Sequence, residues 1–89
     1  MDETKDELKI VVKTADGTRK AEVAVSADQR VKEIVQAAID NWALPKDTDY
    51  TVFNVSTSKL LKQSQTLKEA GVSNSDILEI QPVLVAGAD

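Results

Sequence analysis

The sequence predicts an α+β domain in which a mixed sheet of four to five strands packs on one α-helix. Three features support this prediction. Apolar and polar residues alternate near the N-terminus, one central segment has helical periodicity, and runs of β-branched and aromatic residues follow it. With 89 residues, the chain is long enough for one domain with one modest core.

The first expected element is a β-hairpin over residues 8–25. Leu8, Ile10 and Val12 alternate with their neighbours, which is the period of a half-buried strand. The dipeptide Asp16-Gly17 follows, and it tolerates the positive φ angles of tight turns between antiparallel strands. The alternation then resumes, so the turn is expected to join two paired strands.

A helix is expected next, because apolar residues recur at spacings of three and one, which places them on one helical face. These residues are Val31, Ile34, Val35, Ala38, Ile39 and Trp42. The segment Ser26–Gln29 resembles a capping box, and Pro45 is expected to end the helix through the residue before it. Trp42 is expected to pack on the sheet, with its indole N–H bonded to a carbonyl or to water.

The second half of the chain predicts three more strand segments and one turn of helix. In order, these are a strand over Tyr50–Val55, a short strand at Leu60-Leu61, a helical turn over Thr66–Ala70 that ends at Gly71, and a last strand over Ile77–Ile80 that ends at Pro82.

This order of elements resembles ubiquitin, and specific residues carry the resemblance. They are Ile10-Val11-Val12-Lys13-Thr14 with Gly17, Leu44-Pro45-Lys46-Asp47, Val52-Phe53, and Thr66-Leu67 with Val72 and Leu78. The resemblance spans residues 8–87 and implies a ubiquitin-like β-grasp fold. We expect a flexible charged arm at residues 1–7, the ubiquitin-like domain at 8–82 and a flexible tail at 83–89.

The resemblance also implies a function for the tail. Without a gap after Thr66, Gly87 occupies the position of the terminal glycine through which ubiquitin is joined to lysines. A protein modifier conjugated through Gly87 would first lose Ala88 and Asp89 to a processing protease and would then need an activating enzyme. One glycine replaces the paired glycines of ubiquitin, and the basic residues before them are absent.

A noncovalent role is the alternative, because the stretches Thr66–Val72 and Ser75–Ile80 resemble bacterial YukD-type ubiquitin-like proteins. These proteins are linked to type VII secretion. Sulfur carriers are a third alternative, which the missing Gly-Gly end disfavours.

Protein binding is expected on the open face of the sheet, where ubiquitin has an apolar docking patch. The positions that match this patch are Ala15, Val52 and Gln81, with Glu79 beside them, and only Val52 is clearly apolar. Alternation with Thr51, Phe53 and Val55 on the core side predicts a different patch. The predicted binding face contains Val11, Tyr50, Val52, Ile77, Glu79 and Gln81.

Composition argues against several other functions. The chain has no cysteine and no histidine, so it has no thiolate or imidazole ligand for a metal and no Ser-His or Cys-His dyad. No cofactor motif accompanies the carboxylates, and no enzymatic activity is expected. The net charge of −4 and a single Phe, Trp and Tyr disfavour nucleic acid as a partner. No apolar run has membrane length and no signal-like segment follows Met1, so we expect a cytoplasmic protein.

Overall fold

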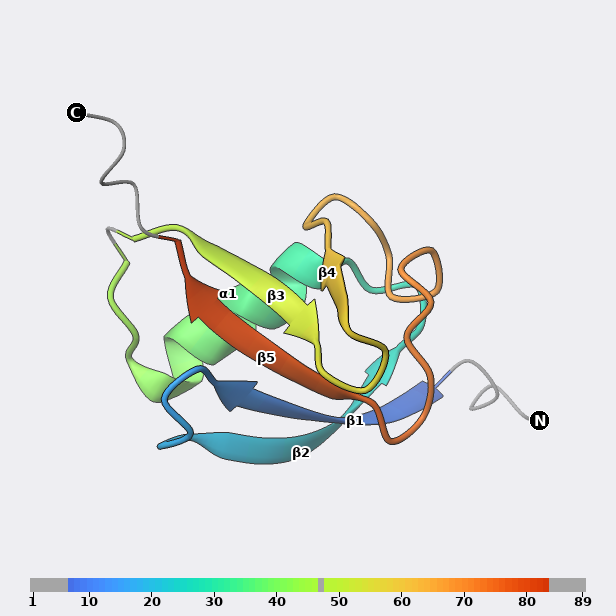
Figure 1. The fold of residues 1–89 in the computed structure, drawn as a ribbon, viewed down its shortest axis with the longest axis horizontal. Coiled ribbons are helices and arrows are strands. Elements are labelled where there is room, and N and C mark those ends of the chain that lie inside the picture. Colours follow the sequence, from blue (N-terminus) through green and yellow to red (C-terminus); the bar gives the residue numbers. More distant parts are fainter. Residues whose placement is uncertain (1–6, 47, 84–89) are drawn as a thin grey trace.

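The computed structural model describes residues 7–46 and 48–83. Its elements follow in the order β1 (Glu7–Thr14), β2 (Lys20–Ser26), α1 (Val31–Trp42), β3 (Tyr50–Asn54), β4 (Lys59–Leu61) and β5 (Ile77–Pro82). The five strands form one sheet in the order β2-β1-β5-β3-β4, and α1 lies across one face of it (Figure 1). The central pair, β1 and β5, is parallel and the other pairs are antiparallel. The predicted α+β architecture is confirmed.

The core lies between α1 and the sheet. The apolar stripe of the helix supplies four of its buried residues, and alternate residues of β1, β3 and β5 supply most of the rest. The buried set is Ile10, Val12, Val31, Ile34, Val35, Ala38, Tyr50, Val52, Leu61, Leu67, Val72, Leu78 and Ile80. Burial of these apolar surfaces is the main favourable contribution to folding. Trp42 packs against this cluster but stays half-buried.

The start of α1 differs from the predicted capping box. The N-cap residue is Arg30, which makes no side-chain cap, and the Ser26 hydroxyl instead accepts a hydrogen bond from the Asp28 amide within the preceding turn. The first helical amides, of Val31 and Lys32, donate to the carbonyls of Gln65 and Gln63. Carbonyls of a loop that is distant in sequence therefore accept the hydrogen bonds of the first helical amides, and a local sequence pattern cannot reveal such partners.

A capping box does occur at the predicted turn over Thr66–Ala70. The Thr66 amide donates to Glu69 Oε1 at 3.0 Å, and the Glu69 amide donates to Thr66 Oγ1 at 3.1 Å. The Ala70 amide reaches the Thr66 carbonyl, which closes a single turn, and Gly71 follows with a φ of 76°. The segment is a hydrogen-bonded turn and does not form a regular helix.

The orientation predicted for β3 is wrong by one residue. Val52 lies opposite Ile80, and directly opposed residues in an antiparallel pair share one face of the sheet. Because Ile80 is buried, Val52 is buried as well, and Phe53 points to the opposite, open face. The third residue of β3 on the core side is Asn54, whose polar side chain is nonetheless fully buried. The alternation of apolar residues therefore did not show which face of β3 is buried.

Only part of the predicted division into arm, domain and tail lies within the described residues. β1 begins at Glu7, one residue inside the segment predicted as an arm, and β5 ends at Pro82. Most of the predicted arm and all of the tail after Val83 lie outside the described residues. The division into arm, domain and tail therefore stays a prediction.

Asp16 organises the β1–β2 turn and gives it a dependence on pH. Its carboxylate accepts hydrogen bonds from the Thr14 hydroxyl and from the amide and hydroxyl of Thr18. These bonds, the one from Thr14 first, lower the pKa of Asp16 from 3.8 to about 2. The ionised carboxylate is thus favoured more strongly in the folded than in the unfolded state.

We expect Asp16→Ala to lower stability at neutral pH and to lose this effect in acid. Since the folded pKa is depressed, the stabilisation is complete above the unfolded pKa and disappears as the pH falls from about 4 to about 2. Urea unfolding of both proteins between pH 7 and pH 2 measures the difference. A difference that stays constant across this range would contradict the assigned cause.

Candidate protein-binding surfaces

The open face of the sheet, opposite α1, has a group of apolar side chains at its centre. Val11 lies opposite Ile77 across the β1–β5 pair, and Phe53 lies opposite Leu60 across the β3–β4 pair. Val55 lies two residues beyond Phe53, and its amide donates to the Ile77 carbonyl at 2.8 Å. We call these five residues, Val11, Phe53, Val55, Leu60 and Ile77, the open-face patch.

Two members of this patch are among the most exposed apolar residues described. Leu60 is 64% exposed and Val55 is 38% exposed, whereas Val11, Phe53 and Ile77 are half-buried between their strand neighbours. Single exposed apolar residues are common on protein surfaces, but a contiguous group indicates a contact surface.

A polar row borders the patch. Lys13 on β1 lies directly between Lys20 on β2 and Glu79 on β5, and Glu79 in turn lies opposite Phe53. The side-chain amide of Gln81 donates from Nε2 to Glu79 Oε1 at 3.1 Å, which holds that carboxylate beside the patch. An apolar centre with a charged border is the usual composition of a protein interface.

Two residues of the predicted binding face do not belong to it. Tyr50 is 8% exposed and Val52 is 0% exposed, and both belong to the core. The Tyr50 hydroxyl donates to the Pro45 carbonyl at 2.9 Å, which ties β3 to the segment after the helix. The prediction that Tyr50 and Val52 lie on the binding face is therefore wrong.

The other four predicted residues, Val11, Ile77, Glu79 and Gln81, lie on strands β1 and β5 with side chains on the open face. Their role in binding stays a prediction. The structure adds Phe53, Val55 and Leu60, of which Phe53 and Val55 were predicted on the core side. The sequence contains no signal that separates the two orientations of β3, because Tyr50 and Val52 have the same period-two spacing as Thr51 and Phe53 and fit a buried face equally well.

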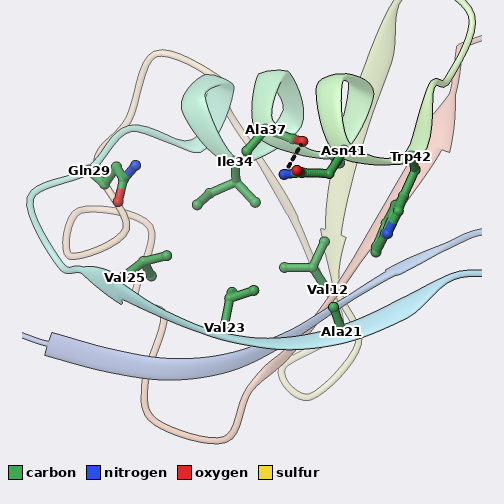
Figure 2. A pocket seen from close by; sticks show the side chains of 10 residues that line it. Val12, Ala21, Val23, Val25, Gln29, Ile34, Ala37, Asn41 and Trp42 are labelled. Atoms are coloured by element: carbon green, nitrogen blue, oxygen red, sulfur yellow. Dashed lines mark hydrogen bonds between the residues drawn. The ribbon is translucent and has the colours of Figure 1, made fainter.

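A second apolar surface lies between α1 and β2, where a groove of about 200 Å³ opens to solvent. The side chains of Ala21, Val23 and Val25 point from β2 towards the helix, and Trp42 closes one end (Figure 2). On the helix side, Asn41 donates to the Ala37 carbonyl at 2.8 Å and both residues are exposed. β2 is an edge strand, so one side of its backbone is not paired within the described sheet.

Solved structures with this arrangement include three that share it over nearly their whole length. The ubiquitin of Caldiarchaeum subterraneum has a TM-score of 0.73 at 24% identity, covering 91% of this chain and 99% of that chain. A designed protein based on ubiquitin has a TM-score of 0.72 at 22% identity, covering 88% and 90%. The UBL domain of yeast Ddi1 has a TM-score of 0.69 at 16% identity, covering 89% and 92%.

The chain has the ubiquitin-like β-grasp fold. At these identities the likeness establishes the fold alone. Comparison of the sequence with protein-family models and with curated proteins finds no match.

The residues that match the docking patch of ubiquitin in sequence do not form an apolar surface in this structure. Val52, the apolar one, is fully buried, while Ala15 is exposed in the hairpin turn and its amide donates to the Ile80 carbonyl at 3.0 Å. The apolar position on the open face of β3 is instead Phe53. The open face of β3 thus presents the larger apolar side chain of Phe53 where the sequence match implied Val52.

The described part of the ubiquitin-like domain offers no metal site and no membrane-spanning helix. Within residues 7–46 and 48–83, no group of three or more carboxylate, histidine or cysteine side chains is placed to hold a metal ion. The same residues contain no helix with the length and apolar character needed to cross a bilayer. Gly87, the predicted conjugation residue, lies outside the described residues.

Proposed function

We propose that this protein is a non-catalytic ubiquitin-like protein that binds other proteins through the open-face patch. The observation that carries the proposal is the apolar centre on the uncovered face of the sheet, where Leu60 alone is 64% exposed. The partner is a protein with an apolar contact residue at its centre, because the patch is neither basic enough for nucleic acid nor concave enough for a small molecule.

Phe53 is the expected energetic centre of this surface. It lies between Leu60 on one side and Glu79 on the other, and rigid aromatic side chains often dominate binding free energies. The row of Lys13, Lys20 and Glu79 would then set the orientation of the partner, since charges at the border of an interface favour one arrangement over others.

The test compares a substitution in the open-face patch with one on the surface of α1. We expect Phe53→Ser to weaken partner binding by about 30-fold, which corresponds to the loss of about 2 kcal/mol typical of an interface hot spot. Ala37→Glu, on the exposed groove side of α1, serves as the matched control and should leave affinity unchanged. The partner is first identified by cross-linking to the wild-type protein in its host, and affinities are then measured by calorimetry.

The opposite result would identify the other surface. If Ala37→Glu abolished binding while Phe53→Ser retained it, the groove between α1 and β2 would be the binding site and the proposal would be wrong. Circular dichroism of both variants establishes that each remains folded.

Conjugation through Gly87 is the second candidate function, and the end of β5 favours it. The strand ends at Pro82, and the Val83 amide still donates to the Asp49 carbonyl at 2.8 Å. Four further residues lead to Gly87, and an extended chain of that length spans about 13 Å. That length would let a glycine enter the narrow site of an activating enzyme after a processing protease removes Ala88 and Asp89.

Mass spectrometry of the protein purified from its own host tests this function. Conjugation predicts a form that ends at Gly87, or lysines of other proteins carrying its C-terminal remnant. Gly87→Ala should remove these products, whereas Asp89→Ala should not, because trimming discards that residue. Recovery of chains that all end at Asp89 would leave noncovalent binding, including the YukD-like role, and a cytoplasmic location remains part of the proposal in either case.

A further inference from the structure

β2 is the longer of the two edge strands of the described sheet, and its edge is regular. It has seven residues, Lys20–Ser26, whereas β4 at the other edge has three. Every residue of β2 pairs with β1 in one continuous antiparallel register, and the strand contains no proline. Bulges, prolines and short length protect many edge strands from pairing with another chain, and β2 has none of these three devices.

The hydrogen bonds to β1 show which backbone groups of β2 face away from the sheet. The Thr14 amide donates to the Arg19 carbonyl at 3.0 Å, so the backbone groups of Arg19 point towards β1. Every second residue after Arg19 does the same, which leaves the N–H and C=O groups of Lys20, Glu22 and Ala24 pointing outward. Among the described residues, no backbone group of a turn or loop bonds to them.

The side chains of β2 differ between its two faces. Ala21, Val23 and Val25 are half-buried and line the groove of about 200 Å³ beside α1 (Figure 2), and the other residues of the strand are exposed. An unpaired backbone edge next to an apolar groove fits an extended strand, because such a strand bonds to the edge and covers the apolar side chains.

The sequence of β2 is complementary to itself in one register. When two copies pair antiparallel with Val23 opposite the partner's Val23, all seven residues overlap, and the outward groups of Glu22 meet those of the partner's Ala24. The neighbouring registers overlap over fewer residues. The register centred on Glu22 also places two carboxylates directly opposite each other, which is destabilising.

We propose that this protein forms a two-fold symmetric dimer through β2, so that the sheets of two copies join into one. The symmetry axis of such an antiparallel pair is perpendicular to the sheet, so both α1 helices lie on one face of the joined sheet. Val23 of each copy then contacts Val23 of the other beside the groove. The proposal does not depend on the proposed function, although the dimer presents both open-face patches on its other face.

Substitutions at Ala24 test both the pairing and its register. Because Ala24 faces the partner's Glu22, Ala24→Lys adds two pairs of opposite charge to the dimer, and Ala24→Glu adds two pairs of like charge. We expect Ala24→Lys to tighten the dimer about fivefold and Ala24→Glu to weaken it about fivefold. Ala24→Pro removes one outward N–H and should leave only monomer. Sedimentation equilibrium over a concentration series measures the dissociation constants.

Two controls separate this pairing from other effects of charge. Within one copy, Ala24 lies opposite Lys9, so Ala24→Glu should stabilise the monomer and Ala24→Lys should destabilise it, the reverse of their effects on the dimer. Urea unfolding of dilute protein measures this difference. Gln36→Lys and Gln36→Glu change the net charge equally at an exposed site of α1 on the side towards β3, and they should leave the dissociation constant unchanged.

Three outcomes would overturn the proposal. Wild-type protein that stays monomeric up to about 1 mM, where even a weak interface is detected, would leave the edge to a strand of another protein. A dimer that Ala24→Lys weakens and Ala24→Glu tightens would have a different register or surface. Equal changes for the Ala24 and Gln36 variants would show that net charge alone controls association. Circular dichroism establishes that each variant is folded.

Discussion

Replacing Val52 with lysine is expected to unfold the domain, whereas the same replacement at Phe53 is expected to leave it folded. Val52 is 0% exposed within the core, and Phe53 faces the open side of the same strand. Burial lowers a lysine pKa by about 3–5 units, which corresponds to about 4–7 kcal/mol and is comparable with the whole stability of many small domains.

Phe53→Lys is the matched control because it introduces the same charge one residue away. Its ammonium group would face solvent next to Glu79, so no desolvation cost arises. Far-ultraviolet circular dichroism and urea unfolding at pH 7 provide the measurement. If Val52→Lys remained folded and Phe53→Lys did not, the orientation of β3 described above would be reversed.

A substitution at Asn54 should have the second large effect. Asn54 is fully buried at the end of β3, and its amide group donates to Asp76 Oδ2 at 3.0 Å. Its side-chain oxygen accepts from the amides of Ser56 and Thr57 at 3.0 and 3.3 Å. These contacts join the turn after β3 to the turn that precedes β5.

Asn54→Ala would remove all three hydrogen bonds, and the buried Asp76 Oδ2 would keep only the bond from the Ser73 amide at 2.9 Å. A hydrogen bond to a charged group contributes about 1.5–3 kcal/mol, and with the two other bonds lost as well we expect a total loss of about 3 kcal/mol in the free energy of unfolding. Urea titration measures this quantity.

Asn41→Ala is the control, since the Asn41 side chain is exposed and bonds only to the Ala37 carbonyl of its own helix. Its expected effect is below about 0.5 kcal/mol. Equal losses in the two variants would argue against a structural role for the buried network around Asn54.

The same network explains why sequence reasoning failed at β3. The segment Tyr50–Asn54 contains apolar residues on both faces, so its periodicity fits two orientations. A buried asparagine is uncommon, and the predicted orientation placed Thr51, Phe53 and Val55 on the core side instead. The structure resolves the ambiguity because Asp76, 22 residues away, lies close enough to satisfy the Asn54 amide.

The candidate binding surface could also be predicted only in part from the sequence. Val11, Ile77, Glu79 and Gln81 could be assigned to one face because β1 and β5 alternate clearly and have buried partners at every second position. Phe53 and Leu60 could not, because their position depends on the pairing of β3 with β4 and β5. The sequence therefore placed Val11 and Ile77 of the patch, and the neighbouring Glu79 and Gln81, on the open face, but not Phe53 and Leu60.

The sequence by itself determined the order and type of the main elements. The turn at Asp16-Gly17, the helical stripe of Val31–Trp42 and the positive φ of Gly71 all depend on the chemistry of adjacent residues. Only the tertiary structure decided how α1 begins, which face of β3 is buried and which residues form the open-face patch. Those features depend on hydrogen bonds and strand pairs between segments far apart in the chain, and local periodicity contains no information about such partners.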